Sequence, residues 1–422
     1  MTLLFTLLQL ALSIFSENPE LSAGNLCGYF PQDTLVSEAP KGYKPFYISH
    51  IARHGSRLIE KASSDCFHSI DSLALYAEKG MLTEDGLTLL EELRMMYQIT
   101  DGHYGALTEL GAREHKQICE RMVRHYPEVF SNPKRTHIEA YSTNIPRVMD
   151  SRDSFLSELS KRAPELKVST FLANSSKKAS QEVKGYHTSK EQEKEVKRQV
   201  KKLRKIGDDI RKDKDDYSAF ASRIFLEPET IPASTLKSLS KLVFRVFKTG
   251  RLTYPATMPS MGKYFTADEL YSMWVSSSIS WLRCVNIRDY TSPYITTKGY
   301  GILDCIVKDA DEAIKAKSSA AATLRFSHDV YLLPLMSALR LEGTVLECED
   351  SELLERFQDF NFSCPACNVQ LIFYRNWCGR ILVKILRNEK ETLIHGLAPK
   401  TGCYYDWKSV KQFWAYSTTP KR

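Results

Sequence analysis

Two arginines flank a histidine in the run Arg53, His54, Gly55, Ser56 and Arg57. An arginine side chain binds phosphate oxygens through two parallel hydrogen bonds and keeps its charge at any accessible pH, so the pair suits an anionic substrate. An imidazole nitrogen placed in line with a phosphorus atom can attack it and form a covalent intermediate that water later hydrolyses. These residue types at this spacing therefore indicate phosphoryl transfer to His54.

The elements that position this run follow from hydrophobic periodicity. Residues 45–51 form a short apolar run with β-branched members, which predicts a strand that leads directly into Arg53. Short apolar runs predict further strands over 137–141, 322–326, 368–374 and 379–387. Helical spacing predicts helices over 83–98, 108–126, 147–159, 302–315 and 331–339. Ligand sites of open α/β sheets lie outside the carboxyl ends of the strands, where Arg53 and His54 stand.

The order of these elements predicts the fold class. Strands that alternate with helices of this length indicate an α/β layer architecture. From about residue 161 to 295 the strand pattern disappears and the density of charged residues rises, which indicates a separate, mostly helical segment. We therefore expect an α/β core from residues 26–160 and 296–422, with a Rossmann-like sheet covered by helices on both faces. Residues 161–295 are expected to form an α-helical covering domain.

Five blocks of the sequence together resemble one known family. They are RHGSR at 53–57 after its strand, LTELG at 107–111, STNIPRVMDS at 142–151, RFSHDVYLLPL at 325–335 and NVQLIFY at 368–374. In this order they are similar to the histidine acid phosphatases, which form branch 2 of the histidine phosphatase superfamily and include phytases and multiple inositol polyphosphate phosphatases. One block alone would be a weak signal, whereas five blocks in the family's order are specific.

The resemblance implies a role for each matching residue. His54 would be the nucleophile, and Asp329 would be the general acid that protonates the leaving oxygen, a contribution of about 10²- to 10⁴-fold. The implied phosphate ligands are Arg53, Arg57, Arg147 and His328, with Lys61 as a further candidate. These roles suit phosphoryl transfer, which depends mainly on positioning and on preorganised positive charge. Because arginines supply that charge, no metal and no cofactor is expected.

The chain departs from the family after the second arginine. Ile59 stands where many acid phosphatases have proline, and Glu60 and Lys61 stand where phytases often have a Thr-Lys pair. Glu60 adds a negative charge there, which disfavours tight binding of a highly charged substrate. The pair His328 and Asp329 is similar to acid phosphatases and phytases, whereas animal-type inositol polyphosphate phosphatases tend to have His-Ala-Glu. The assignment within the branch therefore stays open.

Basic charge is concentrated in the expected covering domain. The 422-residue chain has 58 Lys and Arg against 51 Asp and Glu, a net charge of +7. Residues 177–205 alone hold eleven basic and four acidic side chains. Five lysines recur at helical spacing and are called the lysine stripe below: Lys190, Lys194, Lys197, Lys201 and Lys205. Such a stripe attracts polyanions if it faces a binding site, and an ordinary solvated helix face is the alternative.

The resemblance makes the lysine stripe relevant to the substrate. In this family a variable, mostly helical insertion covers the cleft and sets substrate choice. If the stripe faces the cleft, a polyphosphorylated ring such as phytate is the natural ligand. If it faces solvent, a generic phosphomonoesterase is expected.

The N-terminus and the cysteines bear on localisation. Residues 1–15 form an apolar run where a secretory signal would begin, although no basic residue precedes it, and a buried first helix is the alternative. We expect residues 1–16 to be a signal peptide and the enzyme to be exported, either secreted or periplasmic. Ten cysteines are an even number, compatible with disulfides. Cys364 and Cys367 form a CxxC pair without a second ligand pair, which favours buried thiols or one local disulfide over a metal site.

The sequence thus predicts an exported histidine acid phosphatase that hydrolyses phosphomonoesters through a phosphohistidine intermediate, with inositol polyphosphates as substrates. We expect a monomer that acts on a small molecule, without nucleic acid as a partner and without a membrane-spanning segment. The alternatives are a broad-specificity exported acid phosphatase and a catalytically inactive protein that binds polyanions through the lysine stripe. The mutase arm of the superfamily is disfavoured, because Ser56 stands where mutases usually have Glu.

Overall fold

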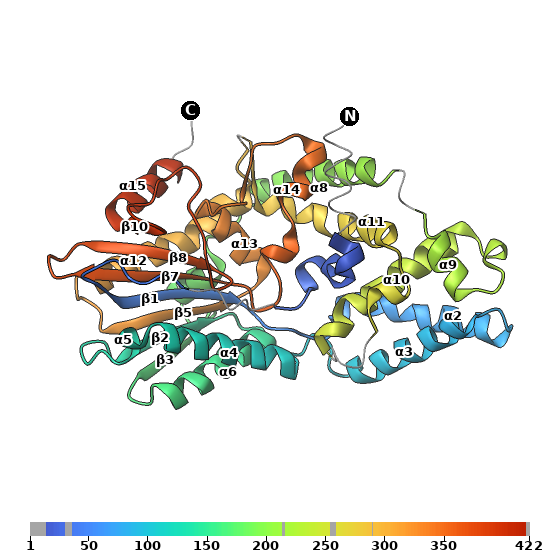
Figure 1. Cartoon of the computed structure of the whole chain (residues 1–422), viewed down its shortest axis with the longest axis horizontal. Helices are drawn as coiled ribbons and strands as arrows, with labels where there is room; N and C mark the ends of the chain where they lie inside the picture. The colour runs from blue at the N-terminus through green and yellow to red at the C-terminus, as the bar shows by residue number, and fades with distance from the viewer. Residues whose placement is uncertain (1–13, 30–35, 213–215, 254–258, 289, 419–422) are drawn as a thin grey trace.

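A mixed sheet of eight strands lies at the centre of the molecule, which the computed structural model describes over residues 14–29, 36–212, 216–253, 259–288 and 290–418 (Figure 1). Its spatial order is β10 (Tyr404–Asp406), β8 (Ile381–Arg387), β7 (Asn368–Asn376), β1 (Tyr43–Arg53), β5 (Ala320–Ser327), β2 (His137–Ser142) and β3 (Lys167–Leu172), and β9 (Lys390–Glu391) pairs with β8. The strands β1, β5, β2 and β3 are mutually parallel, whereas β7, β8 and β10 run antiparallel to their neighbours.

The parallel strands β1 and β5 lie in the middle of the sheet and are buried on both faces. Every residue of β5 is buried, and so is every residue of β1 from Phe46 to its end. Strands covered by helices on both sides have such continuous buried runs. The register pairs Arg53 with Ser327, so β1 and β5 end at the same level.

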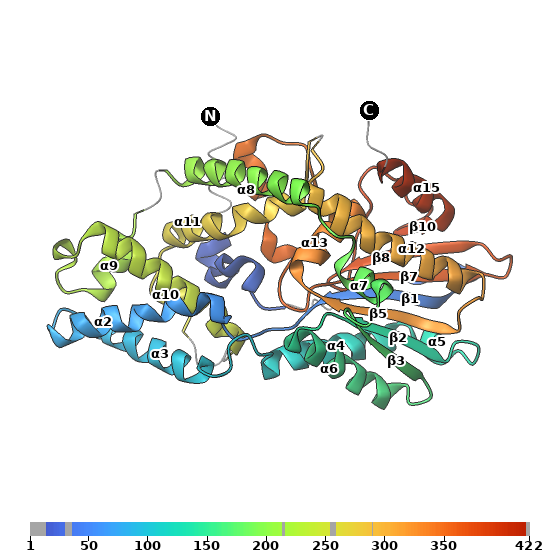
Figure 2. The same cartoon turned by 180° about the vertical axis from the view of Figure 1, so that it is seen from behind.

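Helices cover both faces of the sheet (Figures 1 and 2). One face carries α4 (Glu109–His125), α5 (Pro127–Phe130) and α6 (Pro146–Arg162). The other face carries α7 (Lys177–Lys184), α12 (Tyr300–Ile314), α13 (Asp329–Ala338) and α15 (Trp407–Thr418). The predicted α/β fold with helices on both faces is confirmed.

A helical part lies on the side of the molecule where the parallel strands end (Figure 1). Its longer helices are α2 (His68–Glu78), α3 (Glu84–Thr100), α8 (Lys190–Arg211), α9 (Ser218–Ile224), α10 (Ala233–Thr253) and α11 (Ala267–Ser278). Short elements connect it to the core: the 3₁₀ helices η1 (Pro19–Leu26), η2 (Lys61–Phe67) and η5 (Ile279–Cys284), the helix α14 (Leu353–Arg356), and the strand pair β4 (Asn286–Ile287) and β6 (Val345–Leu346).

The boundary between the two parts differs from the predicted one at two places. β3 falls in the range predicted as the covering domain, yet it is the edge strand of the main sheet. α2 and α3 fall in the range predicted as core, yet α3 packs against α9 and both helices pack against α10. Hydrophobic alternation did not reveal β3 because this edge strand has no buried residue.

The helix α8 presents the lysine stripe to solvent. A capping box at Ser189 begins the helix, and its buried residues Val196, Gln199, Leu203 and Gly207 face α11 and η5. All five lysines of the stripe are exposed. Figure 2 shows α8 along one edge of the molecule, outside the sheet and α13. The stripe therefore lies on the outer face of the helical part.

Most of the predicted signal peptide, residues 1–13, lies outside the described residues. Phe15 is described and is buried, with its ring 5.4 Å from that of Trp274 and 6.4 Å from that of Phe360. All ten cysteines are free thiols in the described part of the chain. Within the same residues, every helix is too short or too polar to cross a lipid bilayer.

Candidate active site

The ends of three neighbouring parallel strands bring six of the predicted site residues together. Arg53 is the last residue of β1, and His54 and Arg57 follow it in the next loop. His328 and Asp329 follow β5, and Arg147 lies in the first turn of α6, after β2. Because β1, β5 and β2 are adjacent and parallel, their carboxyl ends meet at one edge of the sheet, the usual place for a ligand site.

The His54 imidazole is buried, with 2% exposure. Its Nδ1 lies 2.8 Å from the carbonyl oxygen of Gly55. Since a carbonyl can only accept, Nδ1 carries the proton in this hydrogen bond and Nε2 keeps its lone pair. Burial, together with the positive charges of Arg53 and Arg147, holds the pKa of His54 well below its usual value. The imidazole is therefore neutral and nucleophilic near neutral pH.

Glu114 of α4 anchors the loop that follows this histidine. Its carboxylate accepts hydrogen bonds from the Ser56 backbone nitrogen at 2.8 Å and from the Ser56 hydroxyl at 2.7 Å. Burial raises the pKa of Glu114 to about 7, although the bonds from Ser56 oppose the rise. The loop also crosses α4 closely, since a Cβ on Gly55 would stand 2.4 Å from the Gly111 carbonyl oxygen. Both glycines are therefore required at this crossing.

Arg53 forms a buried ion pair with Asp329. The Arg53 Nη2 atom lies 2.9 Å from Asp329 Oδ2, and the two side chains are 1% and 13% exposed. The Asn25 side-chain amide donates to the same Oδ2 at 3.0 Å. Burial raises the pKa of Asp329, but the charge of Arg53 and the neighbouring His328 outweigh it, so this pKa lies below its usual value. Asp329 is thus ionised in the free protein.

Arg57 and Arg147 share one carboxylate. Glu60 Oε1 lies 2.7 Å from Arg147 Nη2, and Glu60 Oε2 lies 3.6 Å from Arg57 Nη2. Burial lowers the pKa of Arg57 to about 10 and lowers that of Arg147, although the charge of Glu60 opposes both shifts. Both guanidinium groups stay protonated near neutral pH. Together with Arg53 they form the arginine cluster, a group of one buried and two partly buried cations.

His328 lies beside His54, with 5.5 Å between the two ring centroids. Its Nε2 lies 3.1 Å from the hydroxyl oxygen of Thr143, which follows β2. Burial and the positive charge of Arg147 lower the pKa of His328. A neutral imidazole at this place can donate one hydrogen bond to a phosphate oxygen without adding a charge.

A family model supports the chemistry that these groups suggest. The model of the histidine phosphatase superfamily (branch 2) matches residues 48–370, a range that contains His54, the arginine cluster and Asp329. The chain belongs to branch 2 of the histidine phosphatase superfamily. It is therefore a phosphatase. No curated protein matches the sequence significantly.

Solved structures of phosphatases share this fold. The multiple inositol polyphosphate phosphatase of Bifidobacterium longum in complex with inositol hexasulfate has a TM-score of 0.74 at 17% identity, over 94% of this chain and 98% of that one. The complex of the same enzyme with phosphate has a TM-score of 0.75 at 16% identity, with the same coverage. The phytase of D. castellii has a TM-score of 0.68 at 12% identity, over 95% of this chain and 86% of that one.

Lys61 is the predicted site residue that the structure does not place with the others. Its side chain is exposed, and its ammonium nitrogen lies 4.3 Å from the centre of the Tyr104 ring. Tyr104 stands next to Gly105, whose Cβ position would be 3.6 Å from an Arg147 guanidinium nitrogen. Lys61 therefore belongs to the rim of the phosphatase site.

Three residues that contact the site residues were not predicted from the sequence. Asn25 carried no signal, because a lone asparagine far before the strand has no pattern around it. Glu114 stood in the predicted helix 108–126 as an ordinary polar residue. Thr143 carried a weak signal, since it follows a predicted strand at the same level as the other site residues. All three act through contacts between segments far apart in the sequence.

The described residues include no group of three or more His, Cys, Asp or Glu side chains that could hold a metal ion. Cys364 and Cys367 of the CxxC pair are both buried, and Ala366 between them donates a backbone hydrogen bond to the His54 carbonyl at 2.9 Å. The Cys367 carbonyl accepts a hydrogen bond from the Arg53 backbone nitrogen. The pair therefore packs as buried thiols beneath the phosphatase site.

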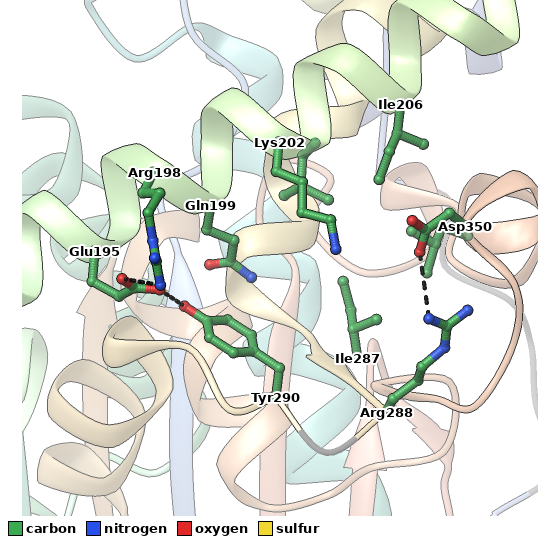
Figure 3. Close-up of a pocket in the computed structure, with 11 residues that line it drawn as sticks. Glu195, Arg198, Gln199, Lys202, Ile206, Ile287, Arg288, Tyr290 and Asp350 are labelled. Carbon is green, nitrogen blue, oxygen red and sulfur yellow. Dashed lines mark hydrogen bonds and ion pairs between the residues drawn. The ribbon is translucent and has the colours of Figure 1, made fainter.

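A cavity of about 550 Å³ lies elsewhere, beneath α8 (Figure 3). Arg198, Gln199 and Lys202 point into it from the helix, and Ile287 and Tyr290 line the opposite wall. Its lining residues include neither the arginine cluster nor His54, nor any lysine of the stripe. This cavity is therefore distinct from the phosphatase site.

Proposed function

We propose that the phosphatase hydrolyses phosphomonoesters through a phosphohistidine intermediate on His54, with inositol polyphosphates such as phytate as its substrates. One observation carries the phosphohistidine mechanism. A neutral, oriented imidazole, the arginine cluster and a carboxyl group meet at one edge of the sheet. The cations would hold the oxygens of the transferred phosphoryl group, which carries its negative charge on those atoms.

In the first chemical step, the Nε2 lone pair of His54 forms a bond to phosphorus while the bond to the ester oxygen breaks. Gly55 supports this step because its carbonyl keeps the proton on Nδ1 and so aims Nε2 as the nucleophile. Asp329 gives its proton to the leaving oxygen, and the alcohol departs. His328, beside His54, would donate to one phosphoryl oxygen.

Asp329 is ionised in the free enzyme, so it must gain a proton before it can donate one. A phosphate dianion on Arg53 places negative charge against the same guanidinium that holds the Asp329 carboxylate. Added negative charge nearby favours the neutral form of a carboxyl group and raises its pKa. Substrate binding would thus protonate the acid that the reaction uses.

In the second step, water attacks the phosphorus atom and the bond to His54 breaks. The Asp329 carboxylate left by the first step takes the proton from this water. Inorganic phosphate leaves, and the imidazole returns to its neutral state. The same carboxyl group therefore acts as acid and then as base, which balances the proton over the cycle.

Inositol polyphosphates are proposed as substrates because similar structures belong to enzymes named for them. The Bifidobacterium longum relative was solved with inositol hexasulfate. The D. castellii relative is a phytase. At these identities the likeness shows the fold alone, and the experiment below tests the substrate.

A broad-specificity phosphomonoesterase is the second candidate, and two observations favour it. The lysine stripe is exposed on the outer face of α8, so its charge does not argue for a polyphosphorylated ligand in the cleft. Glu60 places a carboxylate on the arginines of the site. Either feature would lower the preference for a substrate with many phosphates.

The deciding experiment measures phosphate release by the wild type and by His54→Ala from p-nitrophenyl phosphate and from phytate, with a chelator present. We expect the wild type to act on both substrates and the variant on neither. Wild-type activity on the small ester alone would favour the broad-specificity phosphatase. Undiminished turnover by His54→Ala would contradict the phosphohistidine mechanism, and loss of activity in chelator would show a metal requirement.

We further propose that the enzyme is exported and acts as a monomer. The apolar run at residues 1–15 supports export. Cleavage after residue 16 would remove Phe15, whose ring packs with those of Trp274 and Phe360, so the exported protein would lack this contact. Sequencing the N-terminus of the secreted protein tests the cleavage site, and light scattering tests the monomer.

A further inference from the structure

Glu60 holds the side chains to which the substrate phosphate would bind. Each of its carboxylate oxygens faces a different guanidinium group, at 2.7 Å from Arg147 and 3.6 Å from Arg57. A carboxylate that bridges two arginines makes the same kind of charge-assisted contact as a phosphate group. In the free protein, part of the anion site is therefore already filled by a group of the chain itself.

The burial of the three side chains shows which of them can move. The Arg57 and Arg147 side chains are 12% and 16% exposed, whereas Glu60 is 38% exposed and approaches them from the solvent side. Arg57 is also fixed by a hydrogen bond from its Nη1 to the Leu58 carbonyl, at 2.9 Å. The Glu60 side chain can rotate into water while the arginines stay in place.

The backbone keeps Glu60 beside the site even when its side chain withdraws. Glu60 immediately precedes η2, and its carbonyl oxygen accepts a hydrogen bond from the Ser63 nitrogen at 2.8 Å. Its Cγ lies near Gly105, since a Cβ added to that glycine would stand 3.8 Å from it. A displaced Glu60 carboxylate therefore remains next to the bound substrate.

We propose that Glu60 is a built-in competitor for the substrate phosphate and a specificity-determining residue. It occupies Arg57 and Arg147 in the free enzyme and yields them when a phosphate group binds. It then stays near the scissile group, where its charge disfavours a substrate that carries a second phosphate next to the first. The inference rests on the proposed phosphatase function of this site.

Two consequences follow from this placement. Every phosphate ligand must displace Glu60, so its charge weakens the binding of esters and of inorganic phosphate alike. A polyphosphorylated ring meets a second penalty, because its neighbouring phosphate approaches the displaced carboxylate. The enzyme therefore favours substrates with few phosphates more than it would without Glu60.

The test compares Glu60→Gln with the wild type. Glutamine keeps the size of the side chain and can still accept from Arg147, but it removes the charge. The matched control is Glu91→Gln, because Glu91 also pairs with an arginine, Arg94, at 2.6 Å, and lies on the exposed surface of α3. Calorimetric titration with inorganic phosphate measures binding without turnover, and thermal unfolding checks that each variant is folded.

We expect Glu60→Gln to bind inorganic phosphate about two- to fivefold more tightly, the range that a partly exposed ion pair supports, while Glu91→Gln binds like the wild type. The ratio of kcat/KM for phytate to that for p-nitrophenyl phosphate should rise by a similar factor, mainly through KM. A merely structural role for Glu60 would lower kcat and thermal stability instead.

Unchanged or weaker phosphate binding by a folded Glu60→Gln variant would overturn the proposal. A substrate ratio that stays constant or falls would overturn it as well. A wild type that releases phosphate from neither ester would instead refute the proposed function, and the titration would still report on Glu60. The two failures are thus distinguishable.

Discussion

Replacement of Glu114 by glutamine isolates the contribution of one buried carboxyl group to the loop that carries His54. Glu114 is 4% exposed and contacts Ser56 through both carboxylate oxygens. When this group is protonated, one oxygen accepts from the Ser56 nitrogen and the hydroxyl donates to the Ser56 oxygen. The glutamine amide offers an oxygen that accepts from the Ser56 nitrogen and an NH2 group that donates to the Ser56 hydroxyl oxygen. Glu114→Gln therefore mimics the protonated state at every pH.

The size of the effect follows from the raised pKa. Consider a carboxyl group whose pKa is higher in the folded protein than in the unfolded chain. Its contribution to the free energy of unfolding is complete at pH values below the pKa of the unfolded chain, and it is lost as the pH rises through the pKa of the folded protein. For Glu114 those values are 4.5 and about 7. At 1.36 kcal/mol per pKa unit, the total loss is about 3 kcal/mol, of which about 2 kcal/mol falls between pH 5 and pH 7.5. The glutamine variant does not have this loss.

The assay is urea unfolding of the wild type and Glu114→Gln at pH 5 and pH 7.5. We expect the difference in unfolding free energy between the two proteins to shift by about 2 kcal/mol in favour of the variant at the higher pH. Glu109→Gln is the control, because Glu109 lies on the same helix and is exposed. A difference independent of pH would refute the reasoning, since it would mean that Glu114 is already ionised at pH 5.

Three further predictions concern the acid and the buried histidines. Asp329→Asn should lower kcat about 10²- to 10⁴-fold for an alkyl phosphate and less for p-nitrophenyl phosphate, and equal losses would count against Asp329 as the acid. Asn25→Leu removes the amide that donates to Asp329 at 3.0 Å, so the alkyl phosphate should again lose more kcat than the aryl ester; a loss only in KM would contradict this role. Burial lowers the pKa of His50 and His115 to about 3, so stability is present above about pH 6.5 and falls below it. At pH 5 each of the two histidines should lower the free energy of unfolding by about 2 kcal/mol. The fall in this free energy between about pH 6.5 and pH 5, measured by urea unfolding, should be smaller in His115→Leu.

The sheet and the chain positions of the site could be predicted because both depend on local patterns. β1 and β5 each hold a short, mostly apolar run, and each one leads directly into site residues. The family resemblance gave Arg53 and Asp329 roles in one site, and the parallel register places both junctions at one edge of the sheet. α4 begins after the threonine cap Thr108, a signal within the sequence itself.

The supports of the site could not be predicted because they join segments far apart in the chain. Asn25 lies 304 positions from Asp329, and Glu114 lies 58 positions from Ser56. No periodicity links such pairs, and each residue has an ordinary local explanation. β3 was missed for a different reason, since an exposed edge strand lacks the buried alternation that marks a strand.

The lysine stripe shows the limit of periodicity most clearly. Its spacing predicted correctly that the lysines share one face of a helix, and α8 covers that range. Which face meets the protein is decided by Val196 and Leu203, which α8 buries against α11 and η5. The direction in which the opposite face points depends on where those helices lie, and this is a property of the tertiary structure.

Charge balance connects binding to proton transfer in this site. The three cations of the arginine cluster face two carboxylates, Asp329 and Glu60, which leaves one positive charge before substrate binds. A phosphate dianion would reverse that sign as long as the displaced Glu60 carboxylate stays beside the cluster, and uncompensated charge is costly in such a largely buried place. Protonation of Asp329 restores neutrality, so phosphate binding should take up a proton. Calorimetric titrations in buffers of different ionisation enthalpy measure this uptake directly, and Asp329→Asn should abolish it. Binding without proton uptake by the wild type would mean that Asp329 stays ionised in the complex and cannot be the acid of the first step.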